Sequence, residues 1–215
     1  MPYTQLTLEA AIAALRAGSA VVYPTETFYG IGCDALNPDA VGGIYAAKRR
    51  PYGLPLPVIV GDSRQVSLVA THVFPIAERL MELFWPGPLS IIFPATPEVP
   101  DLLTAGTGRI AVRFSPHPAA VALCRDSGLV LTSSSANISG SPPVVNPDEL
   151  DPELAGGVAG LFDMPPRPAG GLPSSIVDVL PGGQGKGVLR LLREGAISAE
   201  MLQASGFTLM DAGME

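Results

Sequence analysis

The chain contains few of the residues that build metal centres, disulfide frameworks or charged surfaces. Only two cysteines, two histidines and one tryptophan occur in 215 residues, and charged residues make up 15% of the chain. Cys33 and Cys124 stand far apart without a CxxC pair, which argues against a structural zinc site and against a disulfide framework. Acidic residues outnumber basic ones, 20 to 13, which argues against a nucleic-acid binder coated in positive charge. A polyanionic ligand would therefore need a local basic pocket.

Long hydrophobic runs are also missing. No apolar run approaches the length that spans a bilayer, and Glu9 interrupts the stretch where a signal peptide would have its apolar core. We therefore expect a soluble cytoplasmic protein. Hydrophobic residues make up 47% of the chain, and 24 glycines and 23 prolines indicate many turns between short elements. These numbers predict one loop-rich globular domain over residues 1–215.

Hydrophobic periodicity predicts alternating helices and strands. The expected helices are one that begins near residue 8 and ends before Gly18, one that begins at Asn37-Pro38 and ends near Pro51, and others over 63–70, 75–84, 118–125 and 198–204. The expected strands are 20–23, 56–60, 89–93, 109–114, 129–132, 176–179 and 188–192. This order predicts an α/β or α+β domain with one mixed sheet covered by helices. Residues 141–173, rich in Pro and Gly, are the predicted mobile segment and a candidate lid.

Two glycine-rich motifs resemble nucleotide-binding loops but lack the required context. Residues 30–35 (GIGCDA) match the letters of the dinucleotide fingerprint, yet the preceding strand ends too early and the next helix begins too late. Residues 182–187 (GGQGKG) resemble a phosphate loop, but Gly187 stands where that loop needs Ser or Thr. We interpret the second motif as a hairpin connection between two strands.

Polar or cationic side chains follow four predicted strands. Thr25 follows the first, Arg113 and Arg193 come at the ends of two others, and Ser133-Ser134-Ser135-Ala136-Asn137 follows a fourth. Ligands bind at such strand ends in open α/β sheets, although serines also cap turns and arginines also form surface ion pairs. The recurrence at four strand ends favours a ligand site. The GxSxG motif is missing and histidines are scarce, which argues against a catalytic Ser-His-Asp triad. The side chains that remain available for a site are cations and hydroxyls, and these suit phosphate chemistry.

Three adjacent cations, Lys48, Arg49 and Arg50, stand at the end of the predicted second helix. Cations in a last helical turn interact favourably with the helix macrodipole, which explains one or two of these charges. Pro51 and Gly53 then break the helix, so Lys48 and Arg50 are expected on either side of a sharp turn.

Taken together, these motifs resemble the YrdC family, whose members make threonylcarbamoyl-adenylate. The similar segments, in family order, are PTETFYGIGCDA from Pro24, KRRP from Lys48 with PLPVIV beyond it, WPGPLSIIF from Trp85, AVR ending at Arg113, SSSANISG from Ser133, SSIVDV from Ser174 and LREGAIS from Leu192. The set spans nearly the whole chain. The chain departs from the usual family residues at Glu26, Leu54, Ser115 and Ser175.

The resemblance implies a twisted mixed sheet with helices around a concave, positively lined cavity. It implies L-threonine, bicarbonate and ATP with Mg²⁺ as substrates, and threonylcarbamoyl-AMP for tRNA threonylcarbamoyladenosine as the product. The implied catalytic residues are Lys48 and Arg50, the implied ATP-binding residues are Lys48, Arg50, Ser133, Ser135, Asn137 and Arg193, and the implied threonine-binding residues are Thr25, Arg113 and Ser175. No side chain is expected to ligate a metal. A tRNA and a downstream threonylcarbamoyl transferase are the implied macromolecular partners.

The implied chemistry fits these residue types. Threonine's amine takes up carbon dioxide as a carbamate, which attacks the α-phosphorus while pyrophosphate leaves, so cations must offset the repulsion between two anions. We hypothesise that Lys48 and Arg50 serve the triphosphate, with the helix-end effect secondary. Two alternatives stay open: an RNA-binding module that uses the same cavity without adenylating anything, and a carbamoyl-transfer unit of a larger maturation enzyme.

Overall fold

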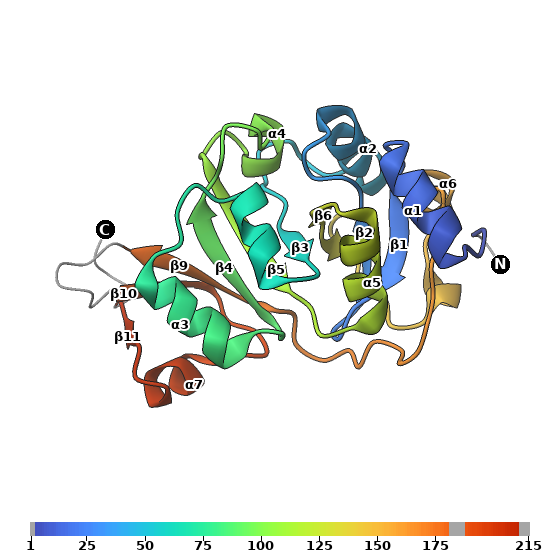
Figure 1. Cartoon of the computed structure of the whole chain (residues 1–215). Helices are drawn as coiled ribbons and strands as arrows, with labels where there is room; N and C mark the ends of the chain where they lie inside the picture. The colour runs from blue at the N-terminus through green and yellow to red at the C-terminus, as the bar shows by residue number, and fades with distance from the viewer. Residues whose placement is uncertain (1–2, 181–187, 211–215) are drawn as a thin grey trace.

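Two mixed sheets lie side by side in the computed structural model, which describes residues 3–180 and 188–210 (Figure 1). The smaller sheet has the strand order β7 (Ser134–Ser135), β2 (Tyr29–Gly32), β1 (Val21–Pro24) and β8 (Gly160–Leu161). The larger has the order β11 (Thr208–Leu209), β10 (Val188–Arg193), β9 (Ser175–Leu180), β4 (Leu89–Pro94), β5 (Arg109–Phe114), β3 (Val58–Val60) and β6 (Leu131–Thr132). The predicted α/β class is confirmed, but the expected single sheet is divided into two.

The division follows from the pairing of β1. β1 is antiparallel to β2 and parallel to β8, two strands that the sequence pattern does not indicate. β2 contains the GIG motif, and its glycines have a packing reason: a Cβ atom on Gly32 would lie 2.3 Å from the Thr132 carbonyl oxygen and 2.9 Å from the Tyr23 ring. The glycines therefore let β2 fit between its neighbours. This agrees with the rejection of a dinucleotide loop.

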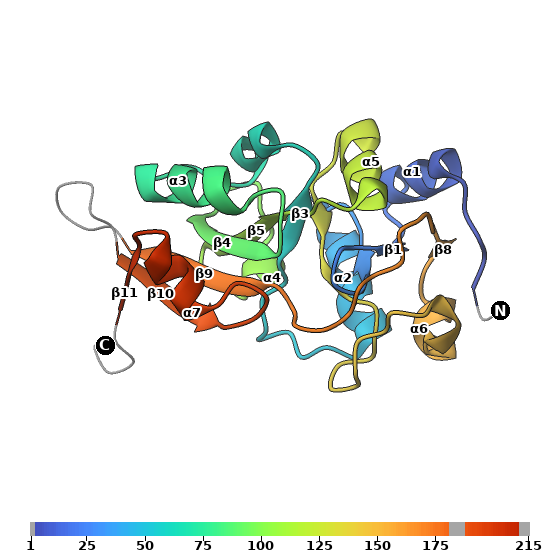
Figure 2. The same ribbon diagram turned by 90° about the horizontal axis from the view of Figure 1, so that it is seen from below.

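Helices cover both sides of the sheets. α1 (Leu8–Arg16), α3 (Pro75–Phe84) and α5 (Pro118–Ser127) lie along one side, and α2 (Pro38–Lys48) and α6 (Pro152–Gly156) lie on the other (Figure 2). The remaining helical segments are α4 (Asp101–Thr104), α7 (Ala199–Ala204) and the 3₁₀ helices η1 (Ser63–Leu68) and η2 (Pro147–Glu149). The predicted start of α2 is confirmed, because the Asn37 side chain accepts hydrogen bonds from the backbone N–H groups of Asp39 and Ala40.

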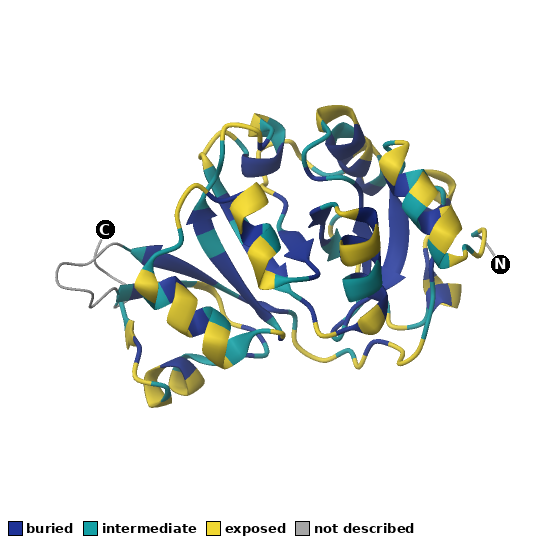
Figure 3. Ribbon diagram, in the orientation of Figure 1, coloured by how far each residue is buried: buried dark blue, intermediate teal, exposed yellow. Residues whose placement is uncertain are grey.

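Two hydrophobic clusters connect the two sheets. The larger cluster contains Val22 and Ile31 from the smaller sheet and Val58, Ile91 and Val177 from the larger sheet. Most of the strands are buried, except β10 and β11 at one edge of the larger sheet, whereas the outer faces of the helices are exposed (Figure 3). Burying one such side chain stabilises a fold by about 1.5–3 kcal/mol. Packing of this kind holds the sheets together and therefore fixes any site that draws residues from both.

Three further features bear on the sequence predictions. The segment 141–173 contains η2, α6 and β8, so part of it belongs to the smaller sheet, while its mobility and the single-domain assignment stay predictions. The glycine-rich connection at 182–187 lies outside the described residues. Within 3–180 and 188–210, no helix has both the length and the apolar character needed to cross a membrane.

Candidate active site

A cavity of about 220 Å³ lies where the two sheets meet. Its wall combines hydroxyl groups and guanidinium groups from segments that are far apart in the sequence. The polar lining residues are Thr25, Thr27, Tyr29, Arg50, Ser90, Arg113, Ser133, Ser134, Ser135, Ser174 and Arg193. The structure thus brings together six of the predicted site residues, namely Thr25, Arg50, Arg113, Ser133, Ser135 and Arg193.

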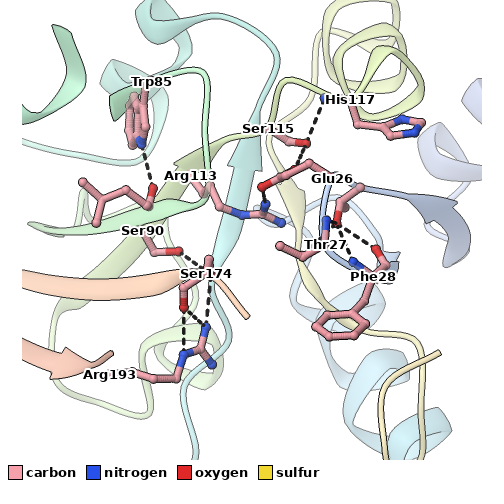
Figure 4. Close-up of polar contacts among 12 residues, drawn as sticks. Glu26, Thr27, Phe28, Trp85, Ser90, Arg113, Ser115, His117, Ser174 and Arg193 are labelled. Atoms are coloured by element: carbon pink, nitrogen blue, oxygen red, sulfur yellow. Dashed lines mark hydrogen bonds and ion pairs between the residues drawn. The ribbon is translucent and has the colours of Figure 1, made fainter. Parts of the chain in front are cut away.

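Arg113 enters this cavity from β5 and is almost fully buried, with 6% of the residue exposed. Its Nη1 forms an ion pair with Glu26, and the hydroxyl group of Ser115 donates to the other carboxylate oxygen at 2.5 Å (Figure 4). Glu26 follows β1, so this ion pair joins the two sheets beside the cavity. Glu26 therefore neutralises the charge of Arg113 on one side of the guanidinium group.

Arg193 stands at the end of β10 on another wall. Its Nε and Nη2 donate to the backbone oxygen of Ser174 at 3.0 and 2.8 Å, and Nη2 also donates to the Ser174 hydroxyl at 3.0 Å (Figure 4). The hydroxyl groups of Ser174 and Ser90 lie 3.3 Å apart. Burial, and secondarily the charge of Arg113, lower the pKa of Arg193 from its usual value. An anionic ligand would relieve this repulsion between two guanidinium groups.

Arg50 reaches the cavity from the turn after α2. Arg49 adopts the left-handed conformation there, with φ 49° and ψ 40°, and Arg50 follows it. The Arg50 guanidinium group donates to the Leu54 carbonyl at 3.3 Å and to the Pro55 carbonyl at 2.8 Å. Leu54 therefore contributes its backbone oxygen to this turn, while the residue as a whole is 48% exposed.

Lys48 lies behind the cavity wall and is not among the lining residues. Its side chain is buried, and its Nζ donates to the backbone oxygens of Ser135 and Asn137, the latter at 2.6 Å. Lys48 continues the buried stripe of Val41 and Ile44 on α2, at the spacing i, i+3, i+7. The amine thus fastens the 133–139 loop to the end of α2. That helical spacing is the sequence signal that indicates an inward-facing lysine.

Burial, and secondarily the charge of Arg50, lower the pKa of Lys48 from 10.5 to about 8. Between about pH 8 and pH 10.5, Lys48 is protonated in the unfolded chain and largely deprotonated in the folded chain. The free energy of unfolding therefore increases with pH across this range. We expect the difference in unfolding free energy between the wild type and Lys48→Ala to grow by about 3 kcal/mol from pH 7.5 to pH 10.5. Denaturant unfolding at a series of pH values measures it; a constant difference would contradict the lowered pKa.

Ser175 and Asn137, two other predicted site residues, form hydrogen bonds within the protein and do not face the cavity. The Ser175 hydroxyl is fully buried, donates to the Ile197 carbonyl at 2.5 Å and accepts from the backbone N–H groups of Gly195 and Ile197 at 3.0 Å. The Asn137 amide donates to the carbonyls of Ile138 and Ser141. Neither residue lines the cavity.

Thr25 does line the cavity and also shapes its own turn. Its hydroxyl group donates to the Phe28 carbonyl at 2.7 Å and accepts from the backbone N–H groups of Thr27 and Phe28 at 3.3 Å. The sequence predictions assigned no site role to five polar residues: Glu26, Thr27, Tyr29, Ser90 and Ser174. Ser174 is adjacent to the predicted Ser175, and Ser90 lies on the neighbouring strand β4, so only the pairing of β4 with β9 could have indicated them.

The site shows no protein cage for a metal ion. Across the part of the chain that the structure describes, no group of three or more His, Cys, Asp or Glu side chains is placed to hold one. Glu26 is the carboxylate beside the cavity, and both of its oxygens already have protein partners. Magnesium commonly binds proteins through nucleotide phosphates, waters and one or two protein oxygens, which this hydroxyl-rich wall can accommodate.

Comparison with known proteins gives one consistent picture. A family model named Sua5_yciO_yrdC, with the description "Telomere recombination", matches residues 13–195. Threonylcarbamoyl-AMP synthase of Bacillus subtilis is 39% identical over 197 residues, covering 90% of this chain, and the protein of that name from Xylella fastidiosa strain M23 is 38% identical over 185 residues, covering 83% of this chain. Sua5 of P. abyssi, solved in complex with L-threonine, superposes with a TM-score of 0.85 at 29% identity over 96% of this chain.

The relatives differ in length. The chain spans 55% of the Bacillus subtilis protein and 61% of the P. abyssi Sua5 chain, but 96% of the Xylella fastidiosa protein. The similarity therefore includes a relative of nearly the same extent as well as longer ones.

Proposed function

The chain belongs to the Sua5/YciO/YrdC family, and from this premise we propose that it is a threonylcarbamoyl-AMP synthase. Its substrates are L-threonine, bicarbonate and ATP, and its products are threonylcarbamoyl-AMP and pyrophosphate. One observation carries the proposal: three arginines from distant parts of the sequence, Arg50, Arg113 and Arg193, line one cavity together with serine and threonine hydroxyls. The relatives with the name of this activity support it.

The reaction joins two anions, and the cavity is built to reduce their repulsion. The threonine amine and bicarbonate form a carbamate with loss of water; a carbamate oxygen then attacks the α-phosphorus of ATP, and pyrophosphate leaves. Arg50 and Arg193 bind the phosphates, with Ser133 and Ser135 as further donors. Preorganised charges of this kind stabilise the transition state because they need no reorganisation during the reaction. No side chain acts as a nucleophile, so alignment of the two substrates supplies much of the rate.

The amino acid is bound on the Arg113 side of the cavity in this proposal. Arg113 receives the substrate carboxylate, and Thr25 contacts the same substrate. Lys48, Asn137 and Ser175 act indirectly: the first two hold the loop that carries Ser133–Ser135, and Ser175 holds the strand start that carries Ser174. Magnesium bound to the ATP phosphates would neutralise part of their charge, and the cavity hydroxyls of Ser133 and Ser135 would lie beside it.

The wider setting follows from the product. Threonylcarbamoyl-AMP would be delivered to a threonylcarbamoyl transferase that modifies tRNA, and we propose the cytoplasm as the place of action. A direct contact with tRNA belongs to the same proposal. The comparisons offer no support for the alternative of an RNA-binding module without adenylating activity.

The test is incubation of the purified protein with threonine, bicarbonate and magnesium-ATP, followed by mass spectrometry. We expect threonylcarbamoyl-AMP to form together with pyrophosphate, and each product to vanish when any one of the three substrates is omitted. A folded sample that makes neither product under these conditions would refute the proposed activity. Binding of labelled RNA in the same sample, with an affinity that falls steeply with salt, would instead support the RNA-binding alternative.

A further inference from the structure

Glu26 lies beside the cavity without lining it. The residue follows β1 in a turn that the Thr25 hydroxyl group fixes through its hydrogen bonds to Thr27 and Phe28. The backbone oxygen of Glu26 also accepts a hydrogen bond from Ala169 at 3.3 Å. The side chain is 18% exposed. The backbone at Glu26 is therefore fixed, and the side chain is mostly buried beside the cavity.

Both carboxylate oxygens of Glu26 have a defined partner. Oε1 accepts from Nη1 of Arg113, and Oε2 accepts from the Ser115 hydroxyl group at 2.5 Å (Figure 4). The Ser115 oxygen in turn accepts from the backbone N–H of His117 at 3.2 Å. His117 is fixed as well, since its Nε2 lies 2.6 Å from the Pro166 carbonyl oxygen. This chain of contacts determines the position of the Glu26 carboxylate from both sides.

Arg113 depends on Glu26 for its orientation. Within the described residues, Nη1 is the guanidinium nitrogen that has a protein acceptor, and that acceptor is Glu26. The other N–H groups of this cavity-lining residue are left for a ligand. A planar guanidinium group binds a carboxylate well only when its two parallel N–H bonds point at it. Fixing one nitrogen therefore fixes the direction of the remaining donors.

We propose that Glu26 is a positioning residue for the amino-acid substrate: it holds Arg113 so that the free edge of the guanidinium group faces the substrate carboxylate. The proposal rests on the proposed function, because it assigns threonine to the Arg113 side of the cavity. Arg193 lines the same cavity with a like charge, so the negative charge of Glu26 offsets the repulsion between the two guanidinium groups. Ser115 contributes by holding the second oxygen of Glu26.

The test compares Glu26→Gln with Glu26→Asp. Glutamine has the shape of glutamate without the charge, whereas aspartate keeps the charge on a shorter side chain. We expect Glu26→Gln to weaken threonine binding about 10- to 100-fold, the range for loss of one hydrogen bond to a charged group. The KM for threonine should rise by a similar factor, with the KM for ATP within about twofold of wild type. Glu26→Asp should recover most of the loss.

Asp178→Asn is the matched control. Asp178 on β9 forms a partly buried ion pair with Arg109 on β5, and neither residue lines the cavity. Like Glu26→Gln, this variant removes a carboxylate charge that pairs with an arginine. It therefore measures how far the loss of such an ion pair, away from the cavity, changes threonine affinity. We expect its threonine affinity to equal that of wild type.

Calorimetry with threonine alone separates this inference from the proposed function. If the wild-type protein binds no threonine and releases no pyrophosphate, the proposed function fails. If the wild type binds threonine and folded Glu26→Gln binds it equally well or more tightly, only the role of Glu26 is overturned. Should Glu26→Gln not fold, Ser115→Ala decides, because a wild-type Kd for threonine in that variant overturns the proposal and a weaker one supports it.

Discussion

Replacing Arg50 with alanine should reduce kcat about 10²- to 10³-fold, the loss typical of removing one preorganised donor from a charged transition state. Arg50 lines the cavity, and its contacts to the Leu54 and Pro55 carbonyls hold it there without neutralising its charge. The fold should persist, because substitutions outside the core usually change stability by less than about 0.5 kcal/mol. Pyrophosphate release under saturating substrates measures the effect.

Arg49→Ala provides the control for this experiment. Arg49 is adjacent in sequence and carries the same charge, but it forms an exposed ion pair with Glu153 at 2.6 Å instead of lining the cavity. Exposed pairs of this kind contribute about 0–1 kcal/mol, so activity should stay near that of wild type. Equal activity in both variants would show that the cavity is not where the triphosphate binds.

Replacing Lys48 with alanine should destabilise the protein as well as inactivate it. The substitution removes a fully buried side chain and leaves the carbonyls of Ser135 and Asn137 without their donor. Relief of the buried charge offsets part of this cost, and we expect a net loss of about 3 kcal/mol at neutral pH. For a domain of this size that corresponds to a fall in Tm of about 6–12 °C, measured by thermal unfolding.

Measuring Tm and kcat of Lys48→Ala together separates two roles for Lys48. If the lysine holds the 133–139 loop, Tm and kcat fall together, because Ser133 and Ser135 lose their support. If the lysine contacts the triphosphate directly, as the family resemblance implies, kcat falls while Tm stays within about 2 °C of wild type. Arg50→Ala, which should show the second behaviour, is the internal reference.

Local signals in the sequence predicted most of the helices and the longer strands. The start of α2 depends on Asn37, Pro38 and a stripe of apolar residues, all within a dozen positions, so no distant contact is needed to recognise it. β2 could not be recognised in this way. Glycines are poor strand formers, and Gly32 is required because the carbonyl of Thr132, 100 positions later, and the Tyr23 ring lie against it.

The candidate site could be predicted only in part for the same reason. Arg50, Arg113 and Arg193 could be identified because each follows or ends a recognisable element. The partner of Arg113 could not, because Glu26 lies 87 positions earlier and the two meet only through the arrangement of the sheets. Lys48 shows the converse case: its chemistry suggests a ligand contact, and its place on the buried stripe of α2 determines that it faces inward.

Arg49, the left-handed residue at the end of α2, makes the site depend on where the three cations stand relative to the helix end. Three consecutive cations have three destinations: Lys48 in the interior, Arg49 in solvent beside Glu153, and Arg50 in the cavity. Deleting one residue before the triplet would move Arg49 into the interior position and bring a guanidinium group to a space shaped for an amine. The position of the triplet relative to the end of α2 therefore matters as much as its composition.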